Sequence, residues 1–261
     1  MRFACLWIIF AGAVFGQSVG VFQQTNPNYP VRNPFYIEGK ITWEKLGITT
    51  PSNAWEFMQR GIHLQDDLED FEGARADYAR ALASNSLENG TCQILRSVPA
   101  TDFGKLDPAP CMFTVRLRLG YLLMKQDPGE AIRLFQEVLK IDKLRLDVNQ
   151  LIGETWVSLA GAADNDADRP TGYSNAIAAF QAELALSPVT AQTIALTGDQ
   201  ANNAHTHWAL ADVYEKLGRY QNASAELEDY LKATKWHSDI YPWRIELARR
   251  KIERLRSLQS E

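Results

Sequence analysis

The sequence has few of the residues that usually carry chemistry. Its 261 residues include three cysteines and four histidines, and the net charge is only -5. This mild acidity argues against binding nucleic acid or an anionic membrane surface, because both attract a basic excess. The GxSxG, HExxH, P-loop and GxGxxG patterns, which position nucleophiles, zinc ligands or phosphates, are also missing. We therefore predict a protein that is not an enzyme and binds no cofactor.

Long apolar runs are scarce as well, since none reaches the ~20 residues of a membrane span. Residues 1–16 combine Arg2 with a shorter apolar run and end in small residues near Gly16, which is the pattern of a secretory signal peptide. We expect cleavage near Gly16, a periplasmic or secreted protein, and no stable membrane span afterwards. An uncleaved N-terminal anchor is the alternative.

Helical periodicity is what the sequence does have. Apolar residues make up 46% of the chain, which is enough for a packed core. In residues 204–237, small and large apolar residues recur three and four positions apart on both sides of Gly218: Leu210, Ala211, Tyr214, Ala223, Leu227 and Leu231. Glycine ends a helix easily because it adopts the left-handed conformation without strain. The segment predicts two short helices packed against each other.

The same pattern recurs in residues 54–88, 113–145 and 146–190. The matching small residues of the first helices are Gly61, Gly120 and Gly153, and the second helices carry the pairs Ala74 and Tyr78, Ala131 and Phe135, and Ala176 and Phe180. These four units resemble the tetratricopeptide repeat, a helix pair with a period of 34 residues. The resemblance implies an all-α fold, a right-handed α-solenoid of helix pairs whose first helices line a concave face.

The rest of the chain is arranged around this repeat domain, which we place at residues 53–237. Residues 17–52 are rich in proline and aromatics, which predicts an extended N-terminal segment. Residues 89–112 have no helical period and form an insertion. Residues 238–261 have a narrow apolar stripe among basic residues, which predicts a capping helix that closes the stack.

Two cysteines, Cys92 and Cys111, bracket the insertion. In an exported protein such a pair is most simply a disulfide. Closing a loop of this length would stabilise the fold by ~3 kcal/mol in the chain-entropy model. A redox role is the alternative, although the sequence contains no CxxC motif.

The histidines do not predict a metal site. His205 and His207 are two residues apart on a predicted helix, so they point to different faces. A zinc site would need ligands spaced i,i+4 or further ligands from elsewhere. We expect His207 to pack at the core or its rim.

An aspartate-rich segment resembles the start of a calcium-binding EF-hand loop, with Asp164, Asp166 and Asp168 at alternate positions. The pattern then fails, because Arg169 replaces the required glycine and Asn175 stands where the bidentate glutamate belongs. We expect no metal here, and a weak calcium site is the alternative left open.

The resemblance also implies a partner-binding groove on the concave face. Carried over unit by unit, its residues include Trp55, Met58, Tyr121, Met124, Glu154, Trp208 and Asp212. Members of the family that bind chaperones carry a clamp of lysine and asparagine on this face. Ile62, Tyr121, Glu154 and Asp212 stand at those positions, so this clamp is absent. A groove of aromatic and acidic residues suits a peptide segment with apolar anchors and some positive charge.

These features favour a non-enzymatic protein–protein interaction scaffold, similar to exported bacterial members of the family, whose partner the sequence does not identify. One alternative is an enzyme or ligand-binding protein that uses the insertions at 89–112 and 163–172. The other is a structural subunit that associates with itself.

Overall fold

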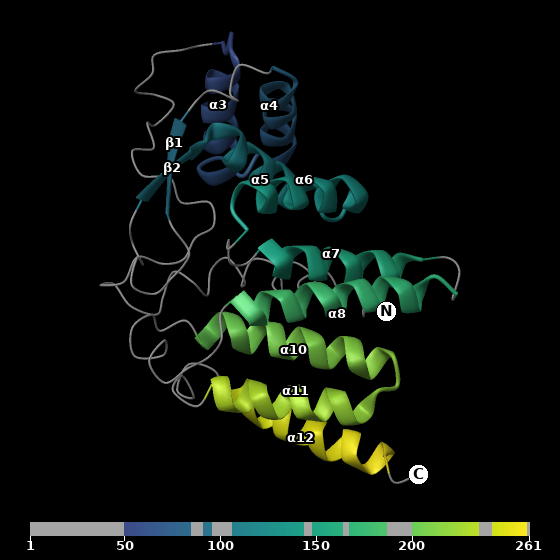
Figure 1. The fold of residues 1–261 in the computed structure, drawn as a ribbon. Coiled ribbons are helices and arrows are strands. Elements are labelled where there is room, and N and C mark those ends of the chain that lie inside the picture. The colour runs from purple at the N-terminus through teal and green to yellow at the C-terminus, as the bar shows by residue number, and fades with distance from the viewer. Residues whose placement is uncertain are drawn as a thin grey trace, which may run out of the picture.

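The computed structural model describes residues 50–84, 91–95, 106–143, 148–163, 167–186, 200–234 and 242–259. Within these ranges nine helices stack in one column, from α3 and α4 at one end to α12 at the other (Figure 1). The helices are α3 (Ala54–Asp66), α4 (Phe71–Ala83), α5 (Cys111–Leu123), α6 (Pro128–Ile141), α7 (Val148–Ala162), α8 (Arg169–Leu186), α10 (Gln200–Lys216), α11 (Tyr220–Ala233) and α12 (Pro242–Leu258).

The helices pack as four pairs followed by a single helix. The pairs are α3 with α4, α5 with α6, α7 with α8 and α10 with α11. The second helix of each pair packs against the first helix of the next pair, and α12 packs against α11. The predicted solenoid of helix pairs is therefore confirmed, and α12 occupies the end of the stack where a capping helix was expected.

Short polar residues and one glycine fix where the helices begin and end. Asn53, Asp70 and Asp127 each accept a hydrogen bond from the backbone N–H three residues later, which caps α3, α4 and α6. Such a cap stabilises a helix by about 1 kcal/mol. Gly218 follows α10 with φ at +70°, the left-handed conformation expected from the sequence.

The two helices of a pair approach closely because a glycine faces an aromatic ring. The three pairs are Gly61 with Tyr78, Gly120 with Phe135 and Gly153 with Phe180. A Cβ atom on any of these glycines would lie 2.5–2.7 Å from the nearest ring carbon. In the fourth pair, Ala211 takes the place of the glycine, and Leu227, which is smaller than an aromatic residue, takes the place of the ring. Both are fully buried.

The core runs along the whole column. Buried apolar side chains form three clusters, and partly buried residues contact two clusters at once. Leu123 packs against both the cluster that contains Tyr78 and the cluster that contains Phe135. Trp156 packs against both the Phe135 cluster and the cluster that contains Phe180. Each helix pair thus buries its apolar face against its neighbours, as solenoid repeats require.

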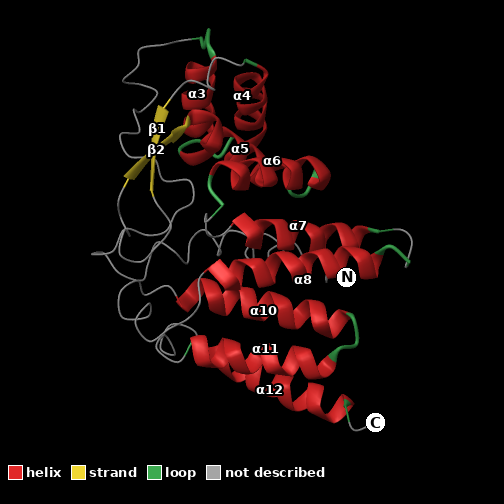
Figure 2. Cartoon of the chain, in the orientation of Figure 1, coloured by secondary structure: helices red, strands yellow, loops and turns green. Residues whose placement is uncertain are grey.

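The insertion contains the one two-stranded sheet of the described residues, drawn yellow in Figure 2. Strand β1 (Thr91–Leu95) pairs antiparallel with β2 (Leu106–Pro110), and Cys92 stands opposite Ala109. Pro108 and Pro110, which argued against a helix here, lie in β2, and the sequence pattern gave no sign of strands. A two-stranded sheet has only edge strands, where proline is tolerated. Cys111 is the first residue of α5, directly after β2, and the disulfide stays a prediction.

Several sequence predictions fall outside the described residues. These are the signal peptide at 1–16, nearly all of the extended segment at 17–52, and the aspartates at 164 and 166. In the part of the chain that is described, no helix is both long enough and apolar enough to span a membrane.

Candidate functional site

Side-chain interactions connect the first helices of successive units along the stack. We call this row of residues the polar seam: Asp66, Arg118, Tyr121, Glu154, His205, Asp212 and Lys251. Its members come from α3, α5, α7, α10 and α12, so the cap helix continues the row of first helices. The predicted groove residues Tyr121, Glu154 and Asp212 all belong to it.

The first junction of the seam is a buried ion pair between α3 and α5. The side chain of Arg118 is only 3% exposed. It donates to Asp66 through Nη1 at 2.8 Å and Nη2 at 3.1 Å, and to Gln65 Oε1 at 3.0 Å. Tyr78 of α4 donates to the same Gln65 oxygen at 2.9 Å. A buried guanidinium is tolerated only when paired in this way, so the contact fixes the first unit on the second.

The middle junction centres on Glu154 of α7. Gln150 Nε2 donates to Glu154 Oε1 at 3.0 Å, and His205 Nε2 of α10 lies 3.3 Å from the same oxygen. Thr206 also donates to Gln150 Oε1 at 3.1 Å. Burial acts to raise the pKa of Glu154, but the contacts with His205 and Gln150 outweigh it, so the pKa lies below its usual value. Glu154 is therefore ionised at neutral pH.

Tyr121 of α5 lies within electrostatic reach of this carboxylate. Burial raises the pKa of the Tyr121 hydroxyl, and the negative charge of Glu154 raises it further. Both side chains remain partly exposed, with Glu154 at 26%. The charge of Glu154 thus acts on Tyr121 across the junction of α5 and α7, and both are predicted groove residues.

The last junction joins α10 to the cap helix. Lys251 of α12 contacts Asp212 and also Glu215, with Nζ 2.8 Å from Glu215 Oε2. The same Nζ lies 5.6 Å from the centroid of the Trp208 ring, which stacks edge-on against Tyr230 at 5.0 Å. The predicted groove residues Trp208 and Asp212 therefore contact the basic face of α12 at this end of the row.

Two of the predicted groove residues belong to the core. Met58 is fully buried in the cluster of the first unit, and Met124 is 8% exposed in the cluster around Phe135. Met58 on α3 and Met124 in the turn after α5 both face the packed interior, so they offer little surface to a partner. Trp55 is partly buried and packs against the same cluster as Met58.

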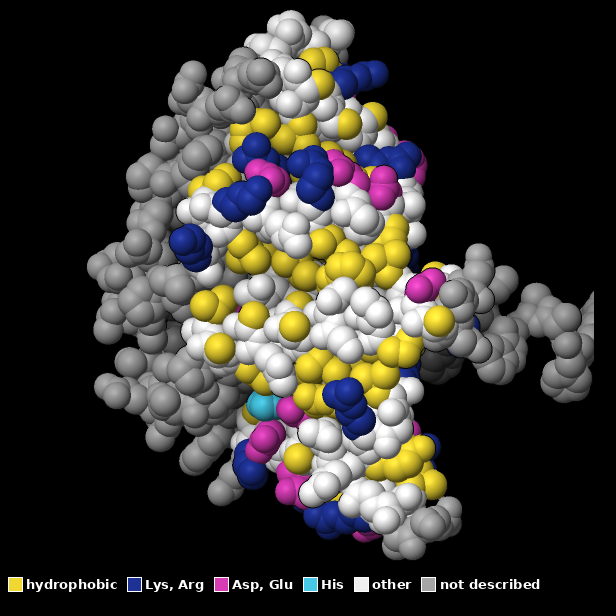
Figure 3. Space-filling view, turned by 45° about the vertical axis from the view of Figure 1, so that its right-hand side comes forward, with side chains coloured by type: hydrophobic (Ala, Val, Ile, Leu, Met, Phe, Trp, Pro, Cys, Tyr) yellow, Lys and Arg dark blue, Asp and Glu magenta, His cyan; other side chains and the backbone are white. Residues whose placement is uncertain are grey.

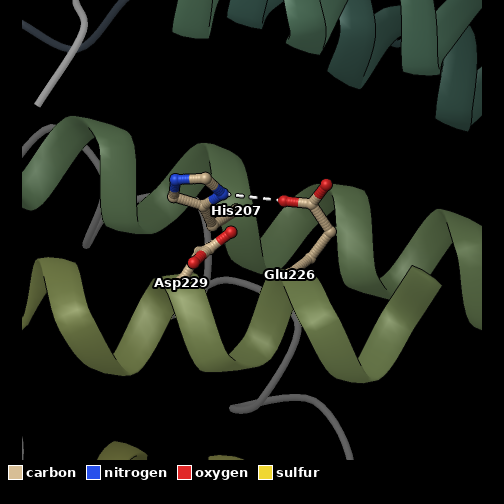
Figure 4. Close-up of side chains that lie close together, drawn as sticks. All are labelled: His207, Glu226 and Asp229. Carbon is tan, nitrogen blue, oxygen red and sulfur yellow. Dashed lines mark hydrogen bonds and ion pairs between the residues drawn. The ribbon is translucent and has the colours of Figure 1, made fainter. Parts of the chain in front are cut away.

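A group of possible metal ligands was missed in the sequence because it is shared by two helices. His207 of α10 faces Glu226 and Asp229 of α11 (Figure 4). One ligand atom from each residue lies within 4.8 Å of the others. His207 Nδ1 is 2.7 Å from Glu226 Oε2, and these side chains are 15% and 20% exposed. The i,i+3 spacing of the two acidic residues was the available signal.

Residues 204–235 match the family model described as "Tetratricopeptide repeat". The fourth unit, α10 with α11, therefore matches the tetratricopeptide repeat in sequence. The matched segment is the most regular of the four units found in the sequence. Among curated proteins, no relative of this repeat protein matched.

Solved structures similar to this repeat protein include the crystal structure of MamA protein, with 16% identity, a TM-score of 0.45, and coverage of 79% of this chain and 92% of that one. Another is TTC0263, a thermophilic TPR protein from Thermus thermophilus, with 17% identity, a TM-score of 0.38, and coverage of 75% and 98%.

The tetratricopeptide-repeat fold is that of a protein–protein interaction scaffold, because stacked units present an extended surface to a partner. Proteins of this type are generally not enzymes. In the present repeat protein, the charged groups of the seam pair with one another between helices. The arrangement is suited to holding units in a fixed relative position while leaving aromatic and acidic side chains partly exposed.

Proposed function

We propose that the protein is an interaction scaffold of the periplasm or cell envelope, and that it binds a partner's peptide segment across the middle of the polar seam. One observation carries this proposal. Glu154 is a partly exposed carboxylate, kept ionised by its neighbours, on a helix with no other charged residue. The following helix, α8, adds only Arg169 and Glu183.

The scarcity of charge in the middle of the column supports an apolar segment with one positive charge. On the face drawn in Figure 3, charged side chains gather toward the two ends of the column, and the middle is mainly apolar or uncharged. Tyr121 on α5 and Trp208 on α10 provide aromatic surface on the first helices of the preceding and following units. A lysine or arginine of the partner would pair with Glu154, and apolar side chains beside it would contact the aromatic rings.

Crosslinking in the native envelope, followed by identification of the bound segment, supplies the ligand for a direct test. The synthetic segment is then titrated into the purified full chain, its Glu154→Gln and Tyr121→Ser variants, and a control. Glu137→Gln is the matched control, because Glu137 lies on the second helix α6 and pairs locally with Lys140 at 2.6 Å. We expect about tenfold weaker binding for each seam variant, which corresponds to ~1.4 kcal/mol, and no change for the control. Equal affinity in all four proteins would exclude the seam as the binding surface.

The location has its own test. We propose export through the signal peptide at residues 1–16, on the strength of its charge and apolar pattern. N-terminal sequencing of the protein recovered from the periplasm should begin near Gln17. Recovery of the intact N-terminus from the cytoplasm would refute the export proposal and leave the binding proposal standing.

A further inference from the structure

We propose that His207, Glu226 and Asp229 form a binding site for a divalent transition-metal ion such as Zn²⁺, bridging α10 and α11. The site lies within the fourth unit and is separate from the partner-binding proposal, which rests on Glu154 and Tyr121. It uses one imidazole nitrogen and two carboxylate oxygens, a donor set that zinc accepts in proteins.

The backbone already places the three side chains correctly. Glu226 and Asp229 are three residues apart on α11, so they project from one face of that helix. His207 reaches the same place from α10 (Figure 4). Their ligand atoms lie within 4.8 Å of one another. Ligand atoms of a tetrahedral zinc site, each ~2.0–2.2 Å from the ion, are about 3.3–3.6 Å apart. Side-chain shifts of roughly an ångström would therefore close the site, and the helices need not move.

The local charge favours a cation. Two carboxylates face one imidazole. The cation paired with Asp229 is Lys232, whose Nζ lies 2.7 Å from Oδ1. Because the Lys232 side chain is 75% exposed, it can leave for solvent when an ion binds. A divalent ion would neutralise both carboxylates at once.

The donor atoms also determine how the ion would be coordinated. His207 coordinates through Nδ1, the nitrogen that now faces Glu226 at 2.7 Å. Three protein ligands leave the fourth position of the ion for water. An ion at this place would tie α10 to α11 in the unit on which the cap helix rests.

The test is calorimetric titration of Zn²⁺ into the full chain after chelator treatment, with His207→Ala and His205→Ala compared. His205 is the matched control, since it lies two residues earlier on the same helix and contacts Glu154 instead of the cluster. We expect micromolar binding that weakens at least tenfold in His207→Ala and is unchanged in His205→Ala. Equal Zn²⁺ affinity in the wild type and His207→Ala would overturn the proposal, as would failure of the wild type to bind.

His207→Ala also removes the contact with Glu226, so its fold could suffer without any metal. Asp229→Asn therefore provides a second variant at a residue that is 45% exposed. Zn²⁺ should raise the melting temperature of the wild type but leave that of Asp229→Asn unchanged. Long-range ¹H–¹⁵N NMR should show the Nδ1 resonance of His207 shifting on Zn²⁺ addition; a shift confined to other histidines would refute the assignment.

Discussion

The ring of Phe135 on α6 lies so close to Gly120 on α5 that a Cβ atom at residue 120 would come within 2.7 Å of the ring carbon Cε1. The two helices can therefore approach this closely only because residue 120 is a glycine and has no Cβ atom. Tyr78 and Phe180 make the same contact with glycines in the first and third pairs. This relation repeats along the stack and can be tested by adding one methyl group.

Gly120→Ala should destabilise the protein, because the added methyl group must displace a buried ring. We expect a loss of about 1–3 kcal/mol in the free energy of unfolding, measured by denaturant titration. Gly161→Ala is the control, since nothing lies within 4 Å of a Cβ at that helical position. It should raise stability by about 0.5–1 kcal/mol. A Gly120→Ala protein as stable as the wild type would contradict the proposed contact.

Adding Phe135→Leu should reduce the loss of stability caused by Gly120→Ala. Gly120→Ala combined with Phe135→Leu reproduces the small and branched pair that the fourth unit has at Ala211 and Leu227. The combined loss should be smaller than the sum of the two single losses, because each change relieves the other. Strict additivity would show that the two sites do not interact.

The stability of the middle junction should depend on acid pH through Glu154. Its folded pKa lies below the reference value of 4.5, so ionised Glu154 stabilises the folded state fully above pH 4.5. That contribution is lost as the pH falls through the folded pKa. Between neutral pH and pH 3, Glu154→Gln should therefore lose less stability than the wild type. Parallel pH profiles in thermal unfolding would disprove this linkage.

Lys251→Met should loosen the cap helix, because it removes the contacts with Asp212 and Glu215 together. Burial acts to lower the pKa of Lys251, but these carboxylates raise it overall above 10.5. Its contribution is thus complete below pH 10.5 and disappears as the pH rises through the folded value. At neutral pH, amide exchange in α12 should quicken in the variant. Lys140→Met, at a lysine whose side chain is 71% exposed, should leave it unchanged.

Reducing the protein should destabilise it if Cys92 and Cys111 are joined. We expect a loss of ~3 kcal/mol in the free energy of unfolding, equal in the reduced wild type and in Cys92→Ser. Thiol labelling of the exported, unreduced protein under denaturing conditions should modify neither residue, and mass spectrometry of the digest would show it. Free thiols at both positions would rule out the bond.

The repeat architecture could be predicted from the sequence because it depends on local spacing. Gly61, Gly120 and Gly153 could be aligned with Ala211 by counting three and four residues along each helix. The aromatic residues that face these glycines were also in the predicted stripes, but the close approach depends on how two helices cross. Periodicity gives the buried face of one helix and leaves the distance to its partner undetermined.

The candidate site was harder to predict because its interactions join residues far apart in the chain. Asp212 was expected to be acidic surface, and Lys251, 39 residues later, neutralises it. Likewise His207 was judged on α10 alone, although its neighbours Glu226 and Asp229 come from α11. Met58 and Met124 were assigned to the groove by position within a unit, but packing with adjacent helices buries them. In each case the neighbouring helix decides the outcome.

The cap helix also places a cation against the aromatic and acidic residues of α10. Lys251 presents a cationic side chain to Trp208 and Asp212, as the proposed partner would present one to Tyr121 and Glu154. The cap helix thus covers the last helix pair with a contact of the same chemistry as the one proposed for the partner. Removing α12 would take Lys251 away from Trp208 and Asp212 and would also expose the face of α11 on which α12 packs.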